Sequence, residues 1–115
     1  GAASGAAIGL IEELRKEAWL VITGGPLTGK QFILYNAMTT IGSSPKCDIA
    51  LLKDQMIAPQ HCVLEIAGAQ HTLRDLGTQT GTAVNGRPIQ RHPLRRGDII
   101  QIGQTTLEYQ DRAVG

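Results

Sequence analysis

The chain has 115 residues, the size of one ordinary domain that can bury a core of its own. Its formal net charge is +1, and its aromatic residues are one Trp, two Tyr and one Phe. A broad nucleic-acid surface needs clustered cations and stacking rings, so we expect no nucleic-acid partner. The densest basic stretch holds Arg87, Arg91, Arg95 and Arg96, and turn residues divide it.

Residues 1–18 are expected to form an N-terminal extension, either a short helix or a disordered segment. Residues 7–18 have a helix-compatible composition, and Gly1, Gly5 and Gly9 make a small-residue ladder like those that let membrane helices approach closely. Two interpretations remain open: the end of a transmembrane segment that starts upstream, or a flexible tail or linker. No stretch approaches the roughly 20 apolar residues that span a bilayer. We therefore expect membrane association only through upstream segments.

A β-rich body is expected over residues 19–110, followed by a short tail over 111–115. Short runs of Val, Ile, Leu and Thr alternate there with clusters of Gly, Pro, Asn and Asp. This regular spacing of strands and turns is typical of an all-β sandwich or barrel. The predicted strands are 19–23, 31–35, 39–42, 48–51, 62–67, 70–76, 81–84, 98–102 and 105–110.

The loop after the first predicted strand, residues 24–30, matches the GxxxxGK pattern of phosphate-binding loops. Such a loop continues with Ser or Thr, which holds magnesium, and with a helix whose N-terminus faces the phosphates. This chain has Gln31 and then a strand pattern at that place. We therefore expect a Gly/Pro hairpin loop and no nucleotide binding.

The thiol and imidazole side chains have no metal-binding spacing. Cys47 and Cys62 are too few and badly spaced for a zinc site, and His61, His71 and His92 form no i,i+4 pair. We expect no metal and no cofactor and, with no Ser at a strand-to-helix turn, no catalytic residues. The two cysteines could pair in an oxidising compartment, but we favour two buried free thiols.

The most informative stretch is 75–86, which reads D-L-G-T-Q-T-G-T-A-V-N-G. Its glycines permit tight turns, Asn85-Gly86 is a strong hairpin dipeptide, and its threonines place hydroxyls on loops. Three more stretches accompany it: T-I-G-S-S-P-K-C-D-I at 40–49, D-Q-M-I-A-P-Q-H-C at 54–62 and R-G-D-I-I-Q-I-G at 96–103. In chain order the four stretches resemble the signatures of forkhead-associated (FHA) domains, and the resemblance runs from about residue 19 to residue 109.

FHA domains are β-sandwiches that read phosphothreonine and are not enzymes. The resemblance therefore implies a sandwich of two antiparallel sheets, a protein or a phosphothreonine peptide as partner, and a role in signalling or assembly. Degenerate FHA-like domains also occur as cytoplasmic parts of membrane-anchored assemblies. By the same resemblance we expect a cytoplasmic location, which includes that of a cytoplasmic domain of a membrane protein.

The resemblance also assigns roles to individual positions. The positions that match architectural residues of the family are Gly42, His61, Gly81, Thr82, Asn85 and Gly86. The positions expected to face a phosphopeptide or partner are Ser43, Ser44, Lys46, Ala58, Thr78, Gln79 and Thr80. In the family, the histidine that matches His61 braces the loops by hydrogen bonding more than it touches the ligand.

The departures from the family pattern fall on the groups that contact phosphate. The family has a phosphate-pairing Arg where this chain has Ser43, a hydroxyl-donating Ser at Ala58 and a peptide-clamping Asn at Thr80. A phosphothreonine carries nearly two charges, and a Ser hydroxyl cannot imitate the bidentate fork of an Arg. We therefore favour an interaction module with weak or no phosphothreonine dependence. The alternative is an active phosphothreonine reader with rearranged contacts from Ser43, Ser44, Lys46 and Thr78.

Overall fold

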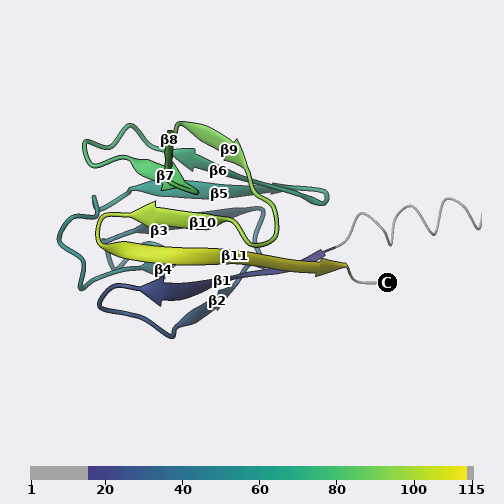
Figure 1. The fold of residues 1–115 in the computed structure, drawn as a ribbon, viewed down its shortest axis with the longest axis horizontal. Coiled ribbons are helices and arrows are strands. Elements are labelled where there is room, and N and C mark those ends of the chain that lie inside the picture. The colour runs from purple at the N-terminus through teal and green to yellow at the C-terminus, as the bar shows by residue number, and fades with distance from the viewer. Residues whose placement is uncertain (1–15, 114–115) are drawn as a thin grey trace, which may run out of the picture.

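The computed structural model describes residues 16–113, which form two β-sheets stacked on a common core (Figure 1). The first sheet has six strands in the order β2-β1-β11-β10-β7-β8. In chain order they are β1 Lys16–Gly24, β2 Gln31–Ile33, β7 Thr82–Val84, β8 Arg87–Ile89, β10 Ile99–Ile102 and β11 Thr105–Ala113.

The second sheet has five strands in the order β4-β3-β5-β6-β9. In chain order they are β3 Met38–Gly42, β4 Ile49–Ala50, β5 Cys62–Ala67, β6 Gln70–Asp75 and β9 Arg91–Pro93. Its pairs are antiparallel except β3 and β4, which run parallel with Ile41 opposite Ile49. The predicted all-β sandwich is confirmed, with one parallel edge in place of a wholly antiparallel sheet.

The parallel edge follows from how the 43–48 loop folds back. The amide and hydroxyl of Thr40 donate to the Asp48 carboxylate at 2.9 and 3.1 Å, and the Asp48 amide donates to the Thr40 hydroxyl at 2.9 Å. These reciprocal bonds hold the end of the loop beside the strand that it left. The chain then continues in the same direction as β3.

Alternation of buried and exposed side chains explains why these segments form strands with one face on the core. Along β1, Leu20 and Ile22 are buried, whereas Trp19 and Val21 are partly exposed. The large side chains that are fully buried between the sheets include Ile41, Leu64, Leu73, Ile100, Leu107 and Tyr109. Burying one such apolar side chain contributes roughly 1.5–3 kcal/mol before the entropy of ordering is counted.

Two strands, β8 and β9, lie outside the predicted set. They contain Pro88 and Pro93, which weaken a strand prediction because proline cannot donate a ladder hydrogen bond. Both are edge strands, where proline is tolerated. The first and last strands along the chain are also longer than expected, since β1 begins at residue 16 and β11 ends at residue 113.

The expected helix or disordered extension over residues 1–18 lies outside the described residues, except for its last three. Residues 16–18 belong to β1 and are therefore strand rather than helix. Within residues 16–113 there is no helix with the length and apolar character needed to cross a membrane.

Both cysteines are free thiols, in agreement with the favoured interpretation. Cys62 is fully buried, whereas Cys47 is only half-buried. Burial, followed by the nearby charge of Asp75, raises the pKa of the Cys62 thiol. Cys62 therefore stays protonated and behaves as a small core residue.

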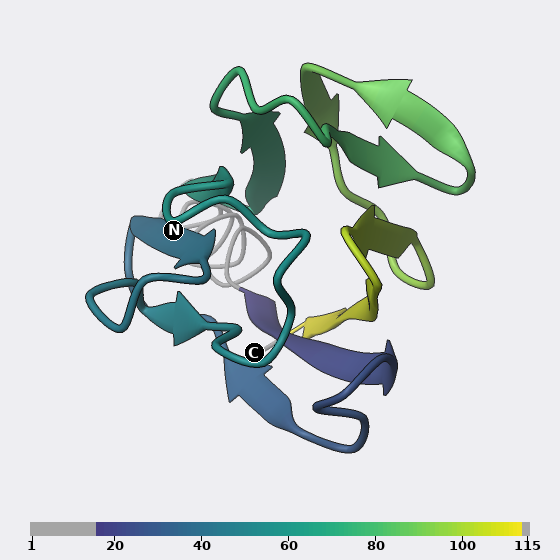
Figure 2. The same ribbon diagram turned by 90° about the vertical axis from the view of Figure 1, so that its left-hand side faces the viewer.

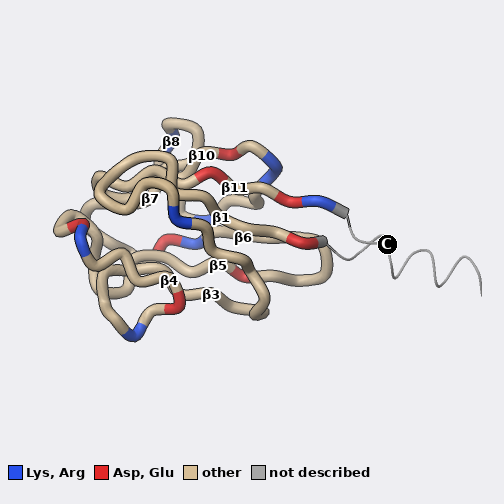
Figure 3. Tube along the Cα trace, turned by 90° about the horizontal axis from the view of Figure 1, so that it is seen from below, with Lys and Arg blue, Asp and Glu red and all other residues tan. Residues whose placement is uncertain are grey.

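Charged residues of both signs are interspersed along the chain trace (Figure 3). Part of the basic stretch is neutralised, because Arg96 lies 3.4 Å from the Asp111 carboxylate. Near the ends of the described chain Arg112 pairs with Glu17 at 2.6 Å.

One end of the sandwich gathers the loops that carry most of the candidate site residues. Figure 2 looks onto this end, where the teal 51–61 loop runs across the face of the molecule. We call the 43–48, 51–61 and 76–81 loops the apex. The described chain ends, at residues 16 and 113, lie at the opposite end of the molecule (Figure 1).

Candidate functional site

Two apex loops are joined by backbone hydrogen bonds. The Ser43 amide donates to the Ala58 carbonyl at 3.0 Å, and the Ser44 amide donates to the Pro59 carbonyl at 3.2 Å. Gly42 has no room for a side chain, because a Cβ there would lie 2.2 Å from the Pro59 oxygen. The 43–48 and 51–61 loops therefore lie against each other, with Ser43 beside Ala58.

His61 connects this pair of loops to the third apex loop. Its side chain is fully buried, and its Nδ1 accepts a hydrogen bond from the Ala58 amide at 3.1 Å. Nε2 then carries the proton in the neutral ring and donates to the Gly81 carbonyl at 2.7 Å, with the Thr78 hydroxyl 3.3 Å away. This geometry fits the bracing role that the sequence predicts for His61.

Asp75 organises the 76–81 loop from within. One carboxylate oxygen accepts from the amides of Gly77 and Thr78 at 2.9 and 3.1 Å, and the other accepts from the hydroxyls of Thr78 and Thr82 at 2.8 Å each. Burial alone would raise the pKa of the Asp75 carboxyl, but these hydrogen bonds lower it below its ordinary value. Asp75 is therefore a charged anchor whose acceptors are already occupied.

Asp54 fixes the 51–61 loop to the turn between β10 and β11. Its fully buried carboxylate accepts from the Gln104 amide and the Thr105 hydroxyl, both at 2.7 Å, and from the Met56 amide at 3.0 Å. At this turn Gly103 has a φ of 57°, and a Cβ there would lie 2.9 Å from the Met56 Cβ. The close approach holds Met56 at the apex surface. Sequence reasoning missed Asp54, because an acidic residue in a polar loop is normally exposed.

The candidate binding side chains on the first two apex loops are accessible. Ser43, Ser44 and Ala58 are half-buried, and Lys46 is exposed. The Ser44 hydroxyl accepts from the Lys46 amide at 3.2 Å, which shapes the turn and leaves the ammonium group in solvent. These residues could offer two hydroxyls and one cation to a ligand.

The third loop contributes less than the sequence suggests. The hydroxyl proton of Thr78 is directed to Asp75, and the hydroxyl of Thr80 donates to the Met56 carbonyl at 2.9 Å. Both hydroxyls therefore join parts of the apex to one another and would have to break a bond to donate elsewhere. The exposed Gln79 lies between them and carries the side-chain amide of this loop.

The structure brings together all of the predicted site residues except Asn85 and Gly86. These two form the turn between β7 and β8, where Asn85 has a φ of 53°. The Asn85 amide nitrogen donates to the Asp98 carboxylate and its oxygen accepts from the Ile99 amide, both at 2.9 Å. Asn85 therefore ties this turn to the loop before β10, away from the apex.

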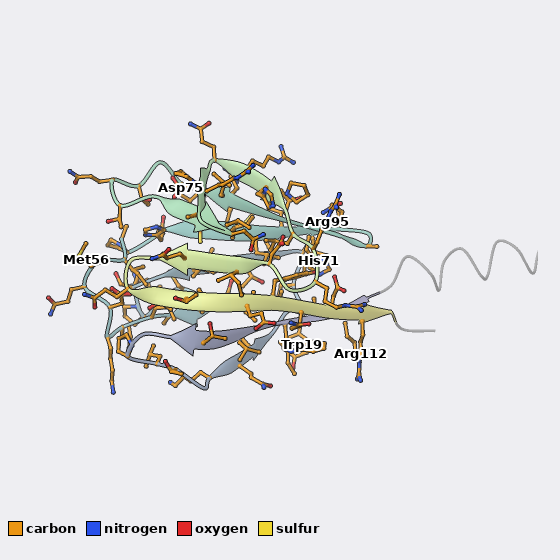
Figure 4. The ribbon with its side chains drawn as sticks, in the orientation of Figure 1. Trp19, Met56, His71, Asp75, Arg95 and Arg112 are labelled. Atoms are coloured by element: carbon orange, nitrogen blue, oxygen red, sulfur yellow. The ribbon has the colours of Figure 1, made fainter. Side chains whose placement is uncertain are left out.

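Three exposed apolar side chains occupy the apex, and sequence reasoning did not single them out. Leu52 is 59% exposed, Met56 51% and Leu76 40%. Figure 4 shows Met56 at the apex end, on the side away from the strands. For Leu52 and Met56 the available signal was their position, since each is an apolar residue in a predicted loop. Leu76 gave no such signal, because the predicted strand 70–76 included it, whereas β6 ends at residue 75.

The GxxxxGK stretch forms the β1–β2 hairpin loop. The Gly29 amide donates to the Ile22 carbonyl and the Ile22 amide donates to the Lys30 carbonyl, both at 2.8 Å. Strand β2 follows at Gln31, so the helix N-terminus of a phosphate-binding loop has no counterpart at this place. The predicted hairpin is confirmed.

The remaining histidines are spread over the fold. His71 is buried with its ring centroid 5.5 Å from that of Tyr109, and the Nε2 of His92 lies 3.7 Å from the Asp98 carboxylate. Within the described residues, no group of three or more His, Cys, Asp or Glu side chains is placed to hold a metal ion.

Comparison with known proteins identifies the family to which the sequence belongs. Residues 20–113 match the model of the Yop-YscD cytoplasmic-domain family. This family is described as the cytoplasmic domain of an inner membrane component of T3SS. The chain is 34% identical over 92 residues to the glycogen accumulation regulator GarA of Mycolicibacterium smegmatis. It is 36% identical over 92 residues to the oxoglutarate dehydrogenase inhibitor of Corynebacterium efficiens. These matches cover 80% of this chain but only 58% and 64% of the two relatives.

Solved structures share the same fold. The FHA domain of the CT664 protein from Chlamydia trachomatis superposes with a TM-score of 0.78 at 28% identity, over 84% of this chain and 99% of that one. The two-sheet topology described above agrees with this likeness. The chain therefore belongs to the Yop-YscD cytoplasmic-domain family and has the FHA fold.

Proposed function

We propose that this domain is a non-catalytic protein-interaction module whose apex binds a partner protein with little or no dependence on phosphate. The observation that carries the proposal is the chemistry of the apex surface. Leu52, Met56 and Leu76 are exposed there, while Ser43 and Ala58 stand at the two positions where the FHA pattern has phosphate-binding Arg and Ser. Covering exposed apolar groups with a protein surface removes them from water, which lowers the free energy of the complex.

The charge at the apex is too small for tight phosphate binding. The cations on the three apex loops are Lys46 and Lys53, and both side chains are exposed to water. A phosphothreonine needs compensation for nearly two negative charges. Losing one partner of a buried charge pair costs about 2–5 kcal/mol, which is roughly one and a half to four decades of affinity. Ser43 supplies no such charge.

Phosphothreonine reading through rearranged contacts is the second candidate. It is supported by the free access to Ser43, Ser44 and Lys46, and by relatives whose names describe regulators. It would have to work without Thr78, because that hydroxyl already donates to Asp75. The remaining hydroxyls and one ammonium group favour weak binding.

The family description suggests the setting in which the module works. We propose that the domain lies in the cytoplasm as part of a membrane-anchored assembly. This rests on the family's description as a cytoplasmic domain of an inner membrane component. The chain itself would then contribute contacts rather than catalysis.

A selection experiment tests the proposed mode of binding. Unphosphorylated peptides would be selected from a display library on the immobilised domain and measured against Met56→Lys and Met38→Lys. The two methionines are each 51% exposed, but Met38 begins β3, away from the apex. We expect Met56→Lys to weaken the selected peptides and Met38→Lys to leave them unchanged. Equal effects of the two variants would contradict apex binding.

A second arm measures the role of phosphate. Phosphothreonine peptides should bind the wild type in the high-micromolar range or more weakly, measured by fluorescence anisotropy with unphosphorylated controls. Ser43→Arg combined with Ala58→Ser should strengthen phosphopeptide binding by at least about tenfold, or about 1.4 kcal/mol. Tight phosphate-dependent binding by the wild type that is lost in Lys46→Ala would instead establish the second candidate.

A further inference from the structure

A groove of about 380 Å³ lies beside the apex, where the ends of β6 and β9 meet the 76–81 loop. It is lined by Arg74, Asp75, Gly77, Gln90 and Arg91. A Cβ added at Gly77 would meet no atom within 4 Å, so the space beside this lining residue is open. Its donors are two guanidinium groups and one side-chain amide, which is a composition suited to an anion.

The strand register places the two arginines directly opposite each other. Arg74 on β6 pairs with Arg91 on β9 in the antiparallel ladder, so their side chains leave the same face of the sheet. Directly opposite residues have Cβ atoms about 4.5–5.5 Å apart, and like charges at that spacing repel. An anion held between the two guanidinium groups would replace this repulsion with two attractions.

The nearby acids leave this charge incompletely balanced. The Glu65 carboxylate accepts from Nε of Arg74 at 2.9 Å. The Asp75 side chain is only 10% exposed, and both of its oxygens already accept two hydrogen bonds each. Among the described residues no ion pair includes Arg91, whereas Arg96 and Arg112 each have a carboxylate partner.

We propose that Arg74 and Arg91 form an oxyanion-binding groove that takes an acidic side chain of the segment bound at the apex. Arg91 is the principal contact, and the unoccupied nitrogens of Arg74 assist it. Gly77 belongs both to the groove and to the 76–81 loop, so the groove adjoins the apex. The proposal rests on the proposed function, because it takes the anion, a carboxylate or a phosphate, to belong to the protein segment bound at the apex.

The groove can be tested with small probes that do not depend on an apex ligand. The ¹⁵N-labelled domain would be titrated with N-acetyl-Glu-Glu-amide, with its neutral counterpart N-acetyl-Gln-Gln-amide, and with N-acetyl-O-phosphothreonine amide. We expect the acidic dipeptide to shift the amide signals of Gly77, Gln90 and Arg91, with weak affinity that disappears at high salt. A stronger effect of the phosphorylated probe would identify phosphate as the preferred source of the anion.

Matched arginine variants complete the test. Arg91→Gln should weaken the acidic dipeptide by about fivefold, the upper end for one exposed ion pair. Arg95→Gln should leave the affinity for the acidic dipeptide unchanged, because this exposed Arg does not line the groove. Arg95 lies toward the opposite end of the molecule from Met56, which marks the apex (Figure 4). Equal effects of the two variants, or equal shifts with the neutral dipeptide, would overturn the proposal. Because none of the three probes needs Met56, failure of anion binding in the groove and failure of partner binding at the apex can be distinguished.

Discussion

Removing the imidazole of His61 should destabilise the domain far more than removing a surface imidazole. In His61→Ala the Ala58 amide and the Gly81 carbonyl lose their partner. A buried polar group left without a partner costs about 1–3 kcal/mol, so the two together cost about 2–6 kcal/mol. A domain of this size is stable by about 5–15 kcal/mol, and each kcal/mol lowers Tm by about 4–8 °C. We therefore expect Tm to fall by about 8 °C or more.

The measurement is thermal and urea unfolding, followed by circular dichroism and by the fluorescence of Trp19. His92→Ala is the matched control, because its side chain is 37% exposed and makes one loose contact at 3.7 Å with Asp98. It should cost less than about 1 kcal/mol. Amide exchange adds a local readout, since the Ala58 amide should exchange much faster in His61→Ala. Similar losses in both variants, with the Ala58 amide still protected, would refute the bracing role.

Three further predictions concern the frame of the apex and the β1–β2 loop. The pKa of Asp75 is lowered in the folded state, so the ionised carboxylate stabilises the fold fully above its unfolded pKa of about 3.9. This stabilisation is lost as the pH falls through the folded pKa. In Asp75→Asn, the free energy of unfolding measured by urea titration should therefore depend less on pH in this acid range. Gly42→Ala should lower the free energy of unfolding in a urea titration by about 1–3 kcal/mol, because its Cβ would lie 2.2 Å from the Pro59 carbonyl oxygen. Gly24→Ala is the control and should cost less, because its Cβ would meet only the Thr106 side chain, at 3.1 Å or more. Calorimetric titration with ATP and magnesium should give no binding at residues 24–30, and micromolar affinity lost in Lys30→Ala would contradict this.

The fold was predictable because its strands carry a strong local signal. The run at residues 105–110 shows it: Leu107 and Tyr109 are buried, whereas Glu108 and Gln110 between and after them are partly exposed. Such alternation and the turn residues around it indicate a strand. The short edge strands β8 and β9 escaped because Pro88 and Pro93 look like turn residues when tertiary position is unknown. The start of β1 was placed too late, because residues 16–18 continue a charged stretch with helical spacing and become strand only through pairing with β11.

The sequence predicted which residues lie together at the candidate site, but not all of the hydrogen bonds that they make. The family pattern located Ser43, Ala58 and His61, and the structure brings them together. Pattern alone could not show that the hydroxyls of Thr78 and Thr80 are occupied within the apex, because their acceptors lie on other segments of the chain or depend on loop conformation. The burial of Asp54 was not predicted either, because polar loops normally expose their acidic residues and two of its partners are about fifty positions further along the chain.

The apex keeps its shape through groups that lie beneath its surface. Ser43 and Ala58 are joined by a hydrogen bond between the backbone amide of one and the backbone carbonyl of the other. Any residue except proline at position 43 could make this bond. The imidazole of His61 and the carboxylate of Asp75 hold the loops from beneath, and neither group bonds to the side chain at position 43 or 58. Substitutions at these two positions can therefore change what the apex binds at little cost in stability. For the same reason, Ser43→Arg with Ala58→Ser should unfold within about 0.5 kcal/mol of the wild type even as phosphopeptide affinity rises.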